Sequence, residues 1–238
     1  MESIRCVAFA GSSWTTGTVR LHGASSRAAC SNWSGVGKGA VVRAAGGTRL
    51  VAVFAGGQSA KKDPKVEQAK QELLGLLKKA RLGRAVANDE ALRAEYNSAI
   101  ANVERLNSSK EPVYDRNLSV RWRLVYTDSQ SILGTKRPPI ARPNDDIFQT
   151  IDASKAQVVN EETTMLFGVL PAKVAVRASL EIKSSTRVNV KFEEFSFLGF
   201  LKVKAPDTFR GWLETTYLDE SLRISRGNLG NVFVLIKE

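Results

Sequence analysis

The spacing of apolar residues changes near Pro112, from a helical period upstream to a period of two downstream. Upstream, apolar residues recur three and four positions apart, which is the pattern of an amphipathic helix. One predicted helix begins at Asp63-Pro64, where Asp can cap and Pro suits the first turn, and ends at Gly83. A second begins near Asn88 and is closed by Pro112. Their apolar stripes are Val66, Leu73, Leu74, Leu76, Leu77 and Ala80, and Leu92, Tyr96, Ala99, Ile100, Val103 and Leu106.

Downstream of Pro112, apolar and polar residues alternate, as they do in strands with one buried face. Val120, Trp122, Leu124 and Tyr126 share one face of the first predicted strand. About eight strands without intervening helices predict a mainly β fold, either an antiparallel sandwich or a closed barrel. A barrel of this size is either filled by its own side chains or leaves room for one small ligand. The predicted strands are 120–126, 147–151, 157–160, 174–182, 187–192, 211–218, 222–224 and 232–236.

The first 62 residues differ in composition from the remainder of the chain. They contain eight Lys/Arg and a single acid, Glu2, and are rich in Ser, Thr, Ala and Gly. This composition is typical of an organellar transit peptide and favours plastid over mitochondrial import. We therefore divide the chain into a transit peptide with a flexible joint (1–57), a helical lead-in (58–112) and a barrel (113–238), with a processing site near 42–45. Because +7 of the net charge of +11 lies in the first 62 residues, a nucleic-acid-binding surface is not favoured.

Both cysteines, Cys6 and Cys30, and the only histidine, His22, lie in the predicted transit peptide. Its removal would leave a protein without Cys or His, which excludes Ser-His-Asp and Cys-His nucleophiles, thiol redox chemistry and nearly all zinc sites. We therefore expect no metal, no cofactor and no catalytic centre. The apolar run 50–55 is far shorter than the roughly 20 residues of a membrane-spanning helix, so no transmembrane segment is predicted.

Several segments resemble the plastid-lipid-associated proteins, also called fibrillins. The sequence RWRLVYT at 121–127, followed by SIL at 131–133, is similar to the first barrel strand of that family. FQTI at 148–151 and LGFLKVKAPD at 198–207 resemble further family segments, the latter nearest to those of thylakoid-associated members. The most specific match is TYLDESLRISRGNLGNVFVL at 216–235, with the signature residues Tyr217, Asp219, Arg223, Arg226, Gly227 and Gly230.

The resemblance covers residues 64–238 and implies a lipocalin-like barrel. It also implies location in plastids, at the stromal side of thylakoids or on plastoglobules, and association with hydrophobic ligands or lipid surfaces. In lipocalin-like barrels a Trp on the first strand is often covered by an Arg from the last, through a cation–π contact. Trp122 with Arg223 or Arg226 is therefore expected either to close one end of the barrel or to contact a ligand. The candidate ligand-binding residues of the interior are Trp122, Tyr126, Phe192, Trp212 and Arg223.

Other segments have a structural and a functional interpretation. Asp219 and Arg223 are expected to form a buried ion pair at a corner between two strands. The Gly-rich segment 226–230 predicts a hairpin turn instead of a phosphate loop, because strand pattern resumes after it without a helix. The basic segment 136–143 is either an ordered loop at the barrel mouth or a contact with anionic lipid, through Lys136, Arg137 and Arg142.

The most apolar stretch, 192–201, is expected to be mostly core, with some residues facing outward as a lipid-facing rim would need.

Three functions follow. The first is a non-enzymatic protein that binds or carries a prenylquinone, carotenoid or similar lipid and coats or docks on thylakoid or plastoglobule surfaces. The second is a soluble adaptor whose packed barrel binds an enzyme of plastid lipid or isoprenoid biosynthesis. The third, an enzyme acting on a lipid through carboxylates, needs two convergent acids. Glu193 and Glu194 cannot supply them, because neighbours on a strand point to opposite faces.

Overall fold

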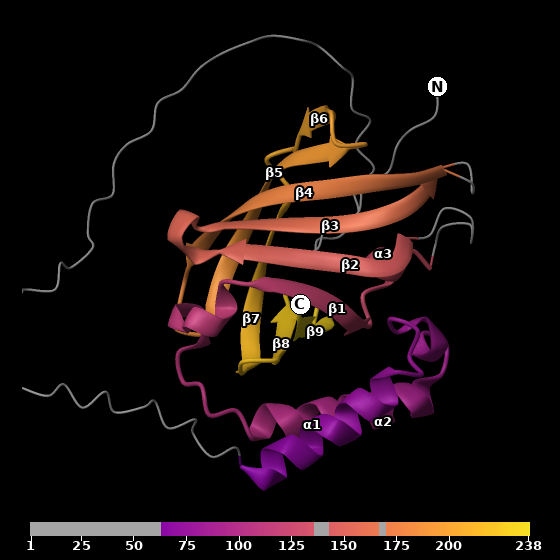
Figure 1. The fold of residues 1–238 in the computed structure, drawn as a ribbon, viewed down its shortest axis with the longest axis vertical. Coiled ribbons are helices and arrows are strands. Elements are labelled where there is room, and N and C mark those ends of the chain that lie inside the picture. Colours follow the sequence, from indigo (N-terminus) through magenta and orange to yellow (C-terminus); the bar gives the residue numbers. More distant parts are fainter. Residues whose placement is uncertain (1–62, 136–142, 167–169) are drawn as a thin grey trace, which may run out of the picture. The chain divides into compact units, whose positions relative to one another are not determined.

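The computed structural model describes residues 63–135, 143–166 and 170–238 (Figure 1). The predicted transit peptide and its processing site lie outside these residues, as do Lys136, Arg137 and Arg142 of the basic loop. No helix among the described residues is both long enough and apolar enough to cross a membrane.

Within the described residues, nine antiparallel strands form one sheet in the order β4-β3-β2-β1-β9-β8-β7-β5-β6. Strand β4 also pairs with β5, so the sheet closes on itself, and β6 extends β5 as a hairpin outside the eight-stranded ring (Figure 1). The predicted mainly β fold is confirmed, and of the two predicted architectures it is the closed barrel. The strands are β1 (Arg121–Thr127), β2 (Pro143–Asp152), β3 (Gln157–Leu166), β4 (Leu170–Ile182), β5 (Arg187–Phe197), β6 (Leu201–Lys204), β7 (Arg210–Leu218), β8 (Leu222–Gly227) and β9 (Val232–Lys237).

Two helices precede the barrel, as the periodicity predicts: α1 (Pro64–Leu77) and α2 (Glu90–Arg105). The carboxylate of Asp63 caps α1 by accepting a hydrogen bond of 2.9 Å from a backbone N–H of the first turn, and Asp89 caps α2 in the same way at 2.9 Å. The shorter helices are η1 (Arg84–Val86), η2 (Pro112–Tyr114), η3 (Arg116–Leu118), α3 (Gln130–Leu133) and η5 (Ala153–Lys155).

The predicted ends of both helices are wrong. Helix α1 stops at Leu77 instead of continuing to Gly83, because the segment after it turns back onto the barrel. Leu82 takes a left-handed conformation, with φ of 62°, and its carbonyl accepts a hydrogen bond of 3.0 Å from Thr127 N at the end of β1. This contact with a strand removes the segment from the helix. Helix α2 likewise ends short of Pro112, which begins a separate 3-10 turn.

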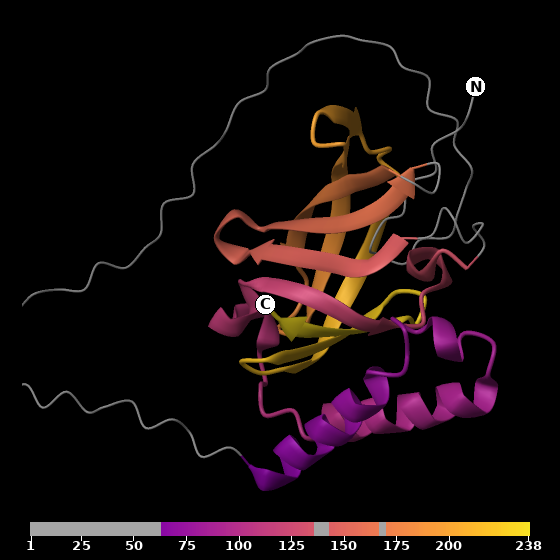
Figure 2. The same ribbon diagram turned by 45° about the vertical axis from the view of Figure 1, so that its right-hand side comes forward.

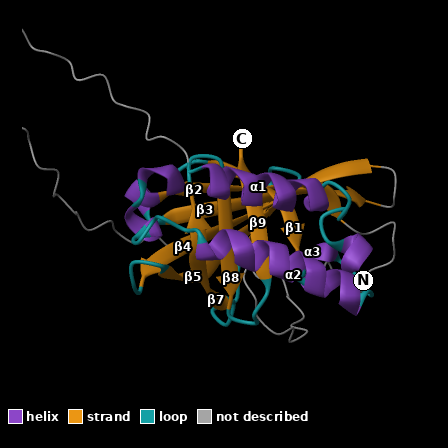
Figure 3. Ribbon diagram, turned by 90° about the horizontal axis from the view of Figure 1, so that it is seen from below, coloured by secondary structure: helices purple, strands orange, loops and turns teal. Residues whose placement is uncertain are grey.

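The apolar residues form two cores on opposite faces of the sheet. One core fills the barrel. The other lies between the two long helices and the outer face of β1, β7, β8 and β9, where Figures 2 and 3 show the helices covering the sheet. The apolar stripes of both helices therefore pack on each other and on the barrel. The buried members of this helix-facing core are Leu73, Leu77, Ala80, Val86, Tyr96, Ile100, Val103, Tyr126, Tyr217, Leu222, Ile224, Val232 and Val234.

One residue of β1 lies on the face opposite to the predicted one. Trp122 and Leu124 point into the barrel, but the register with β9 shifts between Leu124 and Tyr126, so Tyr126 points outward. Its ring stacks on Tyr96 of α2, with centroids 5.6 Å apart, in the helix-facing core. Burial and the nearby Asp128 carboxylate raise the pKa of Tyr126 to about 12. The interpretation of Tyr126 as an interior residue is therefore wrong, because a bulge of this kind interrupts the alternation of faces.

Gly83→Ala is expected to lower the free energy of unfolding by more than about 2 kcal/mol. Gly83 has φ of 111°, and an added Cβ would collide with the carbonyl oxygen of Thr127. Urea denaturation of both proteins measures the change. The matched control is Gly75→Ala within α1, where nothing lies within 4 Å of an added Cβ. The control should be stabilised by roughly 0.5–1 kcal/mol. Equal responses of the two variants would contradict the close approach at Gly83.

Candidate functional site

The barrel interior is the place where the sequence predicts a ligand, and apolar side chains fill it. Trp122, Phe192 and Phe233 are each at most 1% exposed. The whole set of buried residues in this core comprises Leu82, Leu118, Trp122, Leu124, Ile132, Leu133, Ile147, Ile151, Val158, Val176, Ala178, Val190, Phe192, Phe195, Ala205, Leu218, Phe233 and Leu235. Every strand of the ring except β8 therefore contributes apolar side chains to the barrel interior.

A short polar chain crosses this apolar interior. Arg223 of β8 is 2% exposed, and its guanidinium lies 5.2 Å from the centroid of the Trp122 ring. The guanidinium donates a hydrogen bond to Gln149 of β2, whose amide donates one of 2.8 Å to Asn160 of β3. Trp122 Nε1 donates to Leu118 O at 3.1 Å. The predicted contact between Trp122 and Arg223 is thus present, while Arg226 lies elsewhere.

The guanidinium of Arg223 is stabilised by neutral groups and not by a carboxylate. Burial lowers its pKa to about 9, and no acid of the described residues pairs with it. Its Nε has no hydrogen-bond partner among the described residues. The aromatic face of Trp122 and the amide of Gln149 supply the stabilisation instead, and a cation–π contact is strongest when it is desolvated in this way.

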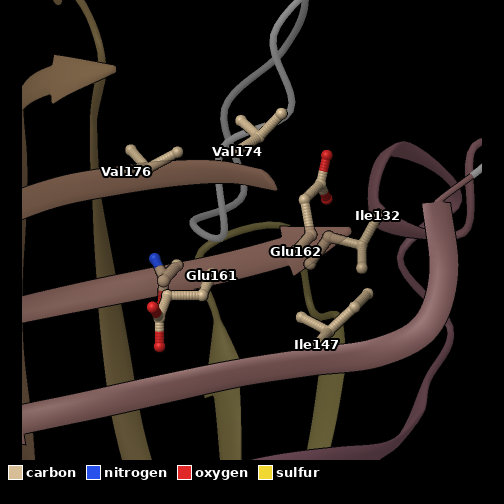
Figure 4. A pocket seen from close by; sticks show the side chains of 7 residues that line it. Ile132, Ile147, Glu161, Glu162, Val174 and Val176 are labelled. Carbon is tan, nitrogen blue, oxygen red and sulfur yellow. The ribbon is translucent and has the colours of Figure 1, made fainter. Parts of the chain in front are cut away.

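A small cavity adjoins this interior beside α3 (Figure 4). Its free volume is about 10 Å³, which is close to the space that one water molecule needs. It is too small for a prenyl or acyl chain. The lining residues are Ile132, Ile147, Asn160, Glu161, Glu162, Val174 and Val176.

Trp212, the second tryptophan proposed for the interior, lies on the outer face of β7. Its neighbour Leu213 packs against the barrel core, so the side chain of Trp212 points to the opposite face. The guanidinium of Arg187 covers its ring at 4.2 Å from the centroid, and Arg187 also forms an ion pair of 2.7 Å with Glu214. The predicted interior position of Trp212 is wrong, because Leu213 and not Trp212 occupies the inward position of the strand.

Asp219 pairs with a helix and not with Arg223. Its carboxylate accepts a hydrogen bond of 2.6 Å from Lys70 of α1 and one of 2.7 Å from the Tyr217 hydroxyl. Burial raises the pKa of Asp219, but the hydrogen bonds from Lys70, the Ser221 N–H and Tyr217 more than offset this, so its pKa lies below the ordinary value. The predicted pair of Asp219 with Arg223 is wrong, because Arg223 points into the barrel from β8.

A second ion pair fixes α2 to the barrel. Arg226 of β8 donates two hydrogen bonds, of 2.8 and 2.7 Å, to the carboxylate of Glu104. The Thr216 hydroxyl donates a third to the same carboxylate at 2.6 Å. Such bidentate pairs between arginine and a carboxylate fix geometry as well as charge. Together the Lys70–Asp219 and Glu104–Arg226 pairs hold the two helices against β7 and β8, which gives these signature residues a structural role.

The two signature glycines form the expected hairpin turn between β8 and β9. Gly230 has φ of 76°, a conformation that favours glycine, and its N–H donates to Gly227 O at 2.9 Å. At Gly227 an added Cβ would lie 3.2 Å from the ring of Phe233, a contact tight enough that the ring would have to shift by a few tenths of an ångström.

Two surface features were not resolved by the sequence. A polar cleft of about 350 Å³ lies between α2 and β7 and is lined by Ala101, Glu104, Arg105, Asn107, Thr186, Glu214, Thr215 and Thr216. The apolar stretch 192–201 divides: Phe192 and Phe195 are core residues, whereas Leu198, Phe200 and Leu201 are exposed at the β5–β6 hairpin. The expectation that this stretch is mostly core is wrong, because the chain turns at 198–200 and exposes three of its six large apolar side chains; the expected outward-facing residues are present. The alternation of residues gave no signal for the cleft, since its walls come from distant segments.

The fold and the site define a closed β-barrel with a packed interior and two helices clamped to its outer face. Residues 67–236 match the sequence model of the PAP_fibrillin family. The chain therefore belongs to the PAP/fibrillin family, as its signature segments predict.

The chain is similar to proteins of several plants over about 70% of its length. The chain is 36% identical to the probable plastid-lipid-associated protein 5, chloroplastic, of Arabidopsis thaliana, over 73% of this chain and 70% of that protein. It is 29% identical to plastoglobulin-1, chloroplastic, of Pisum sativum, over 74% of this chain and 62% of the pea protein. It is also 29% identical to the chromoplast-specific carotenoid-associated protein C1 of an Oncidium hybrid cultivar, over 68% and 69% of the two chains. No solved structure matches.

Asp219→Ala is expected to lower the free energy of unfolding by about 2–4 kcal/mol, because it leaves the buried Lys70 ammonium without its shortest partner. Thermal and urea denaturation measure the change. The matched control is Asp207→Ala, since Asp207 is 70% exposed and lies 3.4 Å from Lys191. That change should stay within about 0.5 kcal/mol. A loss at Asp219 no larger than at Asp207 would contradict the clamp.

The same pair predicts a dependence of stability on pH. Because the pKa of Asp219 is lower in the folded protein than its ordinary value of 3.8, its contribution is fully present above that value and is lost as the pH falls below it. Unfolding curves recorded between neutral pH and pH ~3 should therefore show a smaller acid-induced loss in Asp219→Asn than in the unsubstituted protein. Parallel losses in both proteins would show that other groups control the acid transition.

Proposed function

We propose that the protein is a non-enzymatic, lipid-associated protein of plastids that docks on thylakoid or plastoglobule surfaces from the stromal side. In this proposal the barrel is a packed scaffold and its outer surface meets the lipid. The observation that carries the proposal is the packing of apolar side chains inside the barrel among the described residues, together with a cavity beside α3 that has room for about one water molecule.

The names of its relatives support a plastid location and association with lipid. They include plastid-lipid-associated, plastoglobulin and carotenoid-associated proteins, all chloroplastic or chromoplastic. Exposed large apolar residues at one hairpin of this chain supply a surface that could meet lipid. Such patches on soluble proteins mark sites of interaction with proteins, ligands or membranes.

The arrangement of acids supports a non-enzymatic role. The two acids that line the small cavity, Glu161 and Glu162, are neighbours on β3, so their side chains point to opposite faces of the strand. Glu161 also forms an ion pair with Arg121 at 3.3 Å. A pair of carboxylates acting on one lipid bond would have to converge, and these two do not.

A carrier that holds a prenylquinone or carotenoid inside the barrel is less well supported. The ligand would have to displace buried aromatic side chains such as Phe192 and Phe233, and removing one such side chain from a core costs about 3–5 kcal/mol. Binding of these molecules at the outer surface, or within the lipid to which the protein docks, needs no such rearrangement.

An adaptor for an enzyme of plastid lipid or isoprenoid biosynthesis is the second candidate. The observation that favours it is the polar cleft of about 350 Å³ between α2 and β7. Its walls carry threonines, an asparagine and charged residues, a composition suited to a polar segment of a partner. Docking on lipid and binding such a partner involve different surfaces and are compatible.

A prenylquinone titration tests the packed barrel. In residues 58–238, Trp122 and Trp212 are the only tryptophans, and only Trp122 lies in the interior. Tryptophan emission is followed and corrected for absorption by the quinone. We expect that it shows no saturable quenching of the kind that the Trp122→Phe substitution would remove. Saturable quenching that disappears in this variant would instead place the quinone inside the barrel and support the carrier.

Flotation with vesicles tests docking on lipid. The full chain, and residues 58–238 so that the basic N-terminal segment does not contribute, are mixed with vesicles of galactolipid containing phosphatidylglycerol. We expect both proteins to float with the vesicles. If residues 58–238 stay in the aqueous fraction while binding a soluble biosynthetic enzyme, the adaptor function is the correct one.

A further inference from the structure

We propose that the tip of the β5–β6 hairpin, residues 198–201, is the element that enters the lipid surface, and that it holds the barrel with α1 and α2 directed away from that surface. The surface is an anionic one made of lipid head groups. This inference rests on the proposed docking function and adds to it the residues that dock and the orientation that they impose.

The tip gathers large apolar side chains in water. Phe200 is 76% exposed, and Leu198 and Leu201 are each 43% exposed. Three of the six exposed large apolar residues in the described part of the chain are therefore within four consecutive positions, while the other three, Tyr114, Ile182 and Leu229, are isolated from one another along the sequence. Single exposed apolar residues are ordinary, but a cluster at a projecting tip is unusual in a protein surrounded only by water.

The turn at the tip has a leucine at a position where Asn, Asp or Gly would have less conformational strain. Leu198 and Gly199 have φ of 55° and 81°, and Phe200 N donates to Phe197 O at 3.2 Å, which closes a turn with two left-handed residues. Such turns favour Asn, Asp or Gly at both central positions. The fold therefore accepts conformational strain at Leu198 together with exposure of its side chain. Insertion of the tip into lipid would offset the cost of exposing the Leu198 side chain to water.

The hairpin is firmly attached to the barrel. β6 pairs with β5 over four residue pairs, and Leu198 N donates to Lys173 O of β4 at 2.9 Å. At its base, the ring of Phe195 lies edge-on to Phe209, with centroids 5.9 Å apart. A tip held in this way presents its side chains in a fixed direction, so its insertion would orient the whole barrel.

Basic side chains surround the tip. Lys202 and Lys204 follow it on β6, and Lys173 lies beside it on β4; all three are exposed. Glu194 pairs with Lys202 at 3.3 Å, which leaves an excess of positive charge near the tip. Lysines at the border of an inserted apolar segment remain in the head-group region, where they attract anionic lipids.

The hairpin and the helices lie at opposite ends of the molecule. In both Figure 1 and Figure 2, β6 projects at the top of the barrel, while α1 and α2 cross its lower side. A lipid surface that receives the tip would thus leave the helices, and the polar cleft beside α2, exposed to the aqueous phase.

The experiment places a polarity-sensitive fluorophore at the tip of the full chain. In a Cys6→Ser, Cys30→Ser background, Phe200→Cys is labelled with an NBD group, and Glu72→Cys on the exposed side of α1 carries the same label as a control. Vesicles of galactolipid containing phosphatidylglycerol are added, with a lipid-borne quencher. We expect a blue shift and quenching of the label at position 200 and neither response at position 72.

Each outcome decides between the proposals. If the chain floats with the vesicles while the label at 200 stays in water, or the label at 72 enters the lipid, the hairpin inference is overturned and docking stands. If the chain does not float, both fall. Vesicles without phosphatidylglycerol should weaken the response at position 200, and an unchanged response would overturn the role of the lysines.

Substitutions separate insertion from folding. Leu198→Asn suits the left-handed turn better than leucine, so the variant should unfold at equal or higher urea concentration. In the full chain it should nevertheless bind vesicles more weakly, and the double variant Phe200→Ser, Leu201→Ser should bind about tenfold or more weakly. The matched control is Leu229→Ser, at the tip of the β8–β9 hairpin, which is 57% exposed and should bind as the unsubstituted protein does. Equal losses in this control would overturn the assignment of the tip.

Discussion

The strands β8 and β9 are buried on both faces, and this double burial joins the two cores of the protein. Along β8, Leu222 and Ile224 face the helices, while Arg223 and Ser225 face the barrel interior. Along β9, Phe233 packs inside the barrel and its neighbours pack under the helices. An antiparallel sheet can have one face exposed to water, but here the helices pack on that face and cover it. Loss of the helices would therefore expose one side of the sheet's most apolar strands.

Charged residues fix this arrangement where apolar contacts alone would not. Lys70 of α1 pairs with Asp219 in the turn between β7 and β8, and Glu104 of α2 pairs with Arg226 of β8, so each long helix has one ion pair to this hairpin. Apolar faces pack in several registers at similar cost, whereas a buried ion pair with hydrogen bonds is favourable in only one. Asp219 and Arg226 thus fix the position of the two helices on the barrel.

The filled interior changes where a lipid-associated function can reside. Arg223, Gln149 and Asn160 form a hydrogen-bonded chain inside the barrel, beside the buried ring of Trp122. In the proposed function, lipid meets the outer surface, where the exposed apolar residues of the β5–β6 hairpin and the polar cleft by α2 lie at different places. A single protein could in this way dock on a lipid surface and keep a second surface available for a partner.

The sequence by itself determined the mainly β fold class with a closed barrel as one of two architectures, the presence of the two helices with the cap at Asp63, and the family. The fold class and the helices follow from local periodicity and turn chemistry, which depend on neighbouring residues only, whereas the family follows from the resemblance of its segments to those of the fibrillins. Tertiary structure alone decided the end of α1, since Leu82 leaves the helix to bond β1, and the outward position of Tyr126, since a bulge shifts the register with β9. It also decided the partner of Asp219, which is Lys70, 149 residues away in the chain, because pairing across such a separation is set by the packing of whole elements.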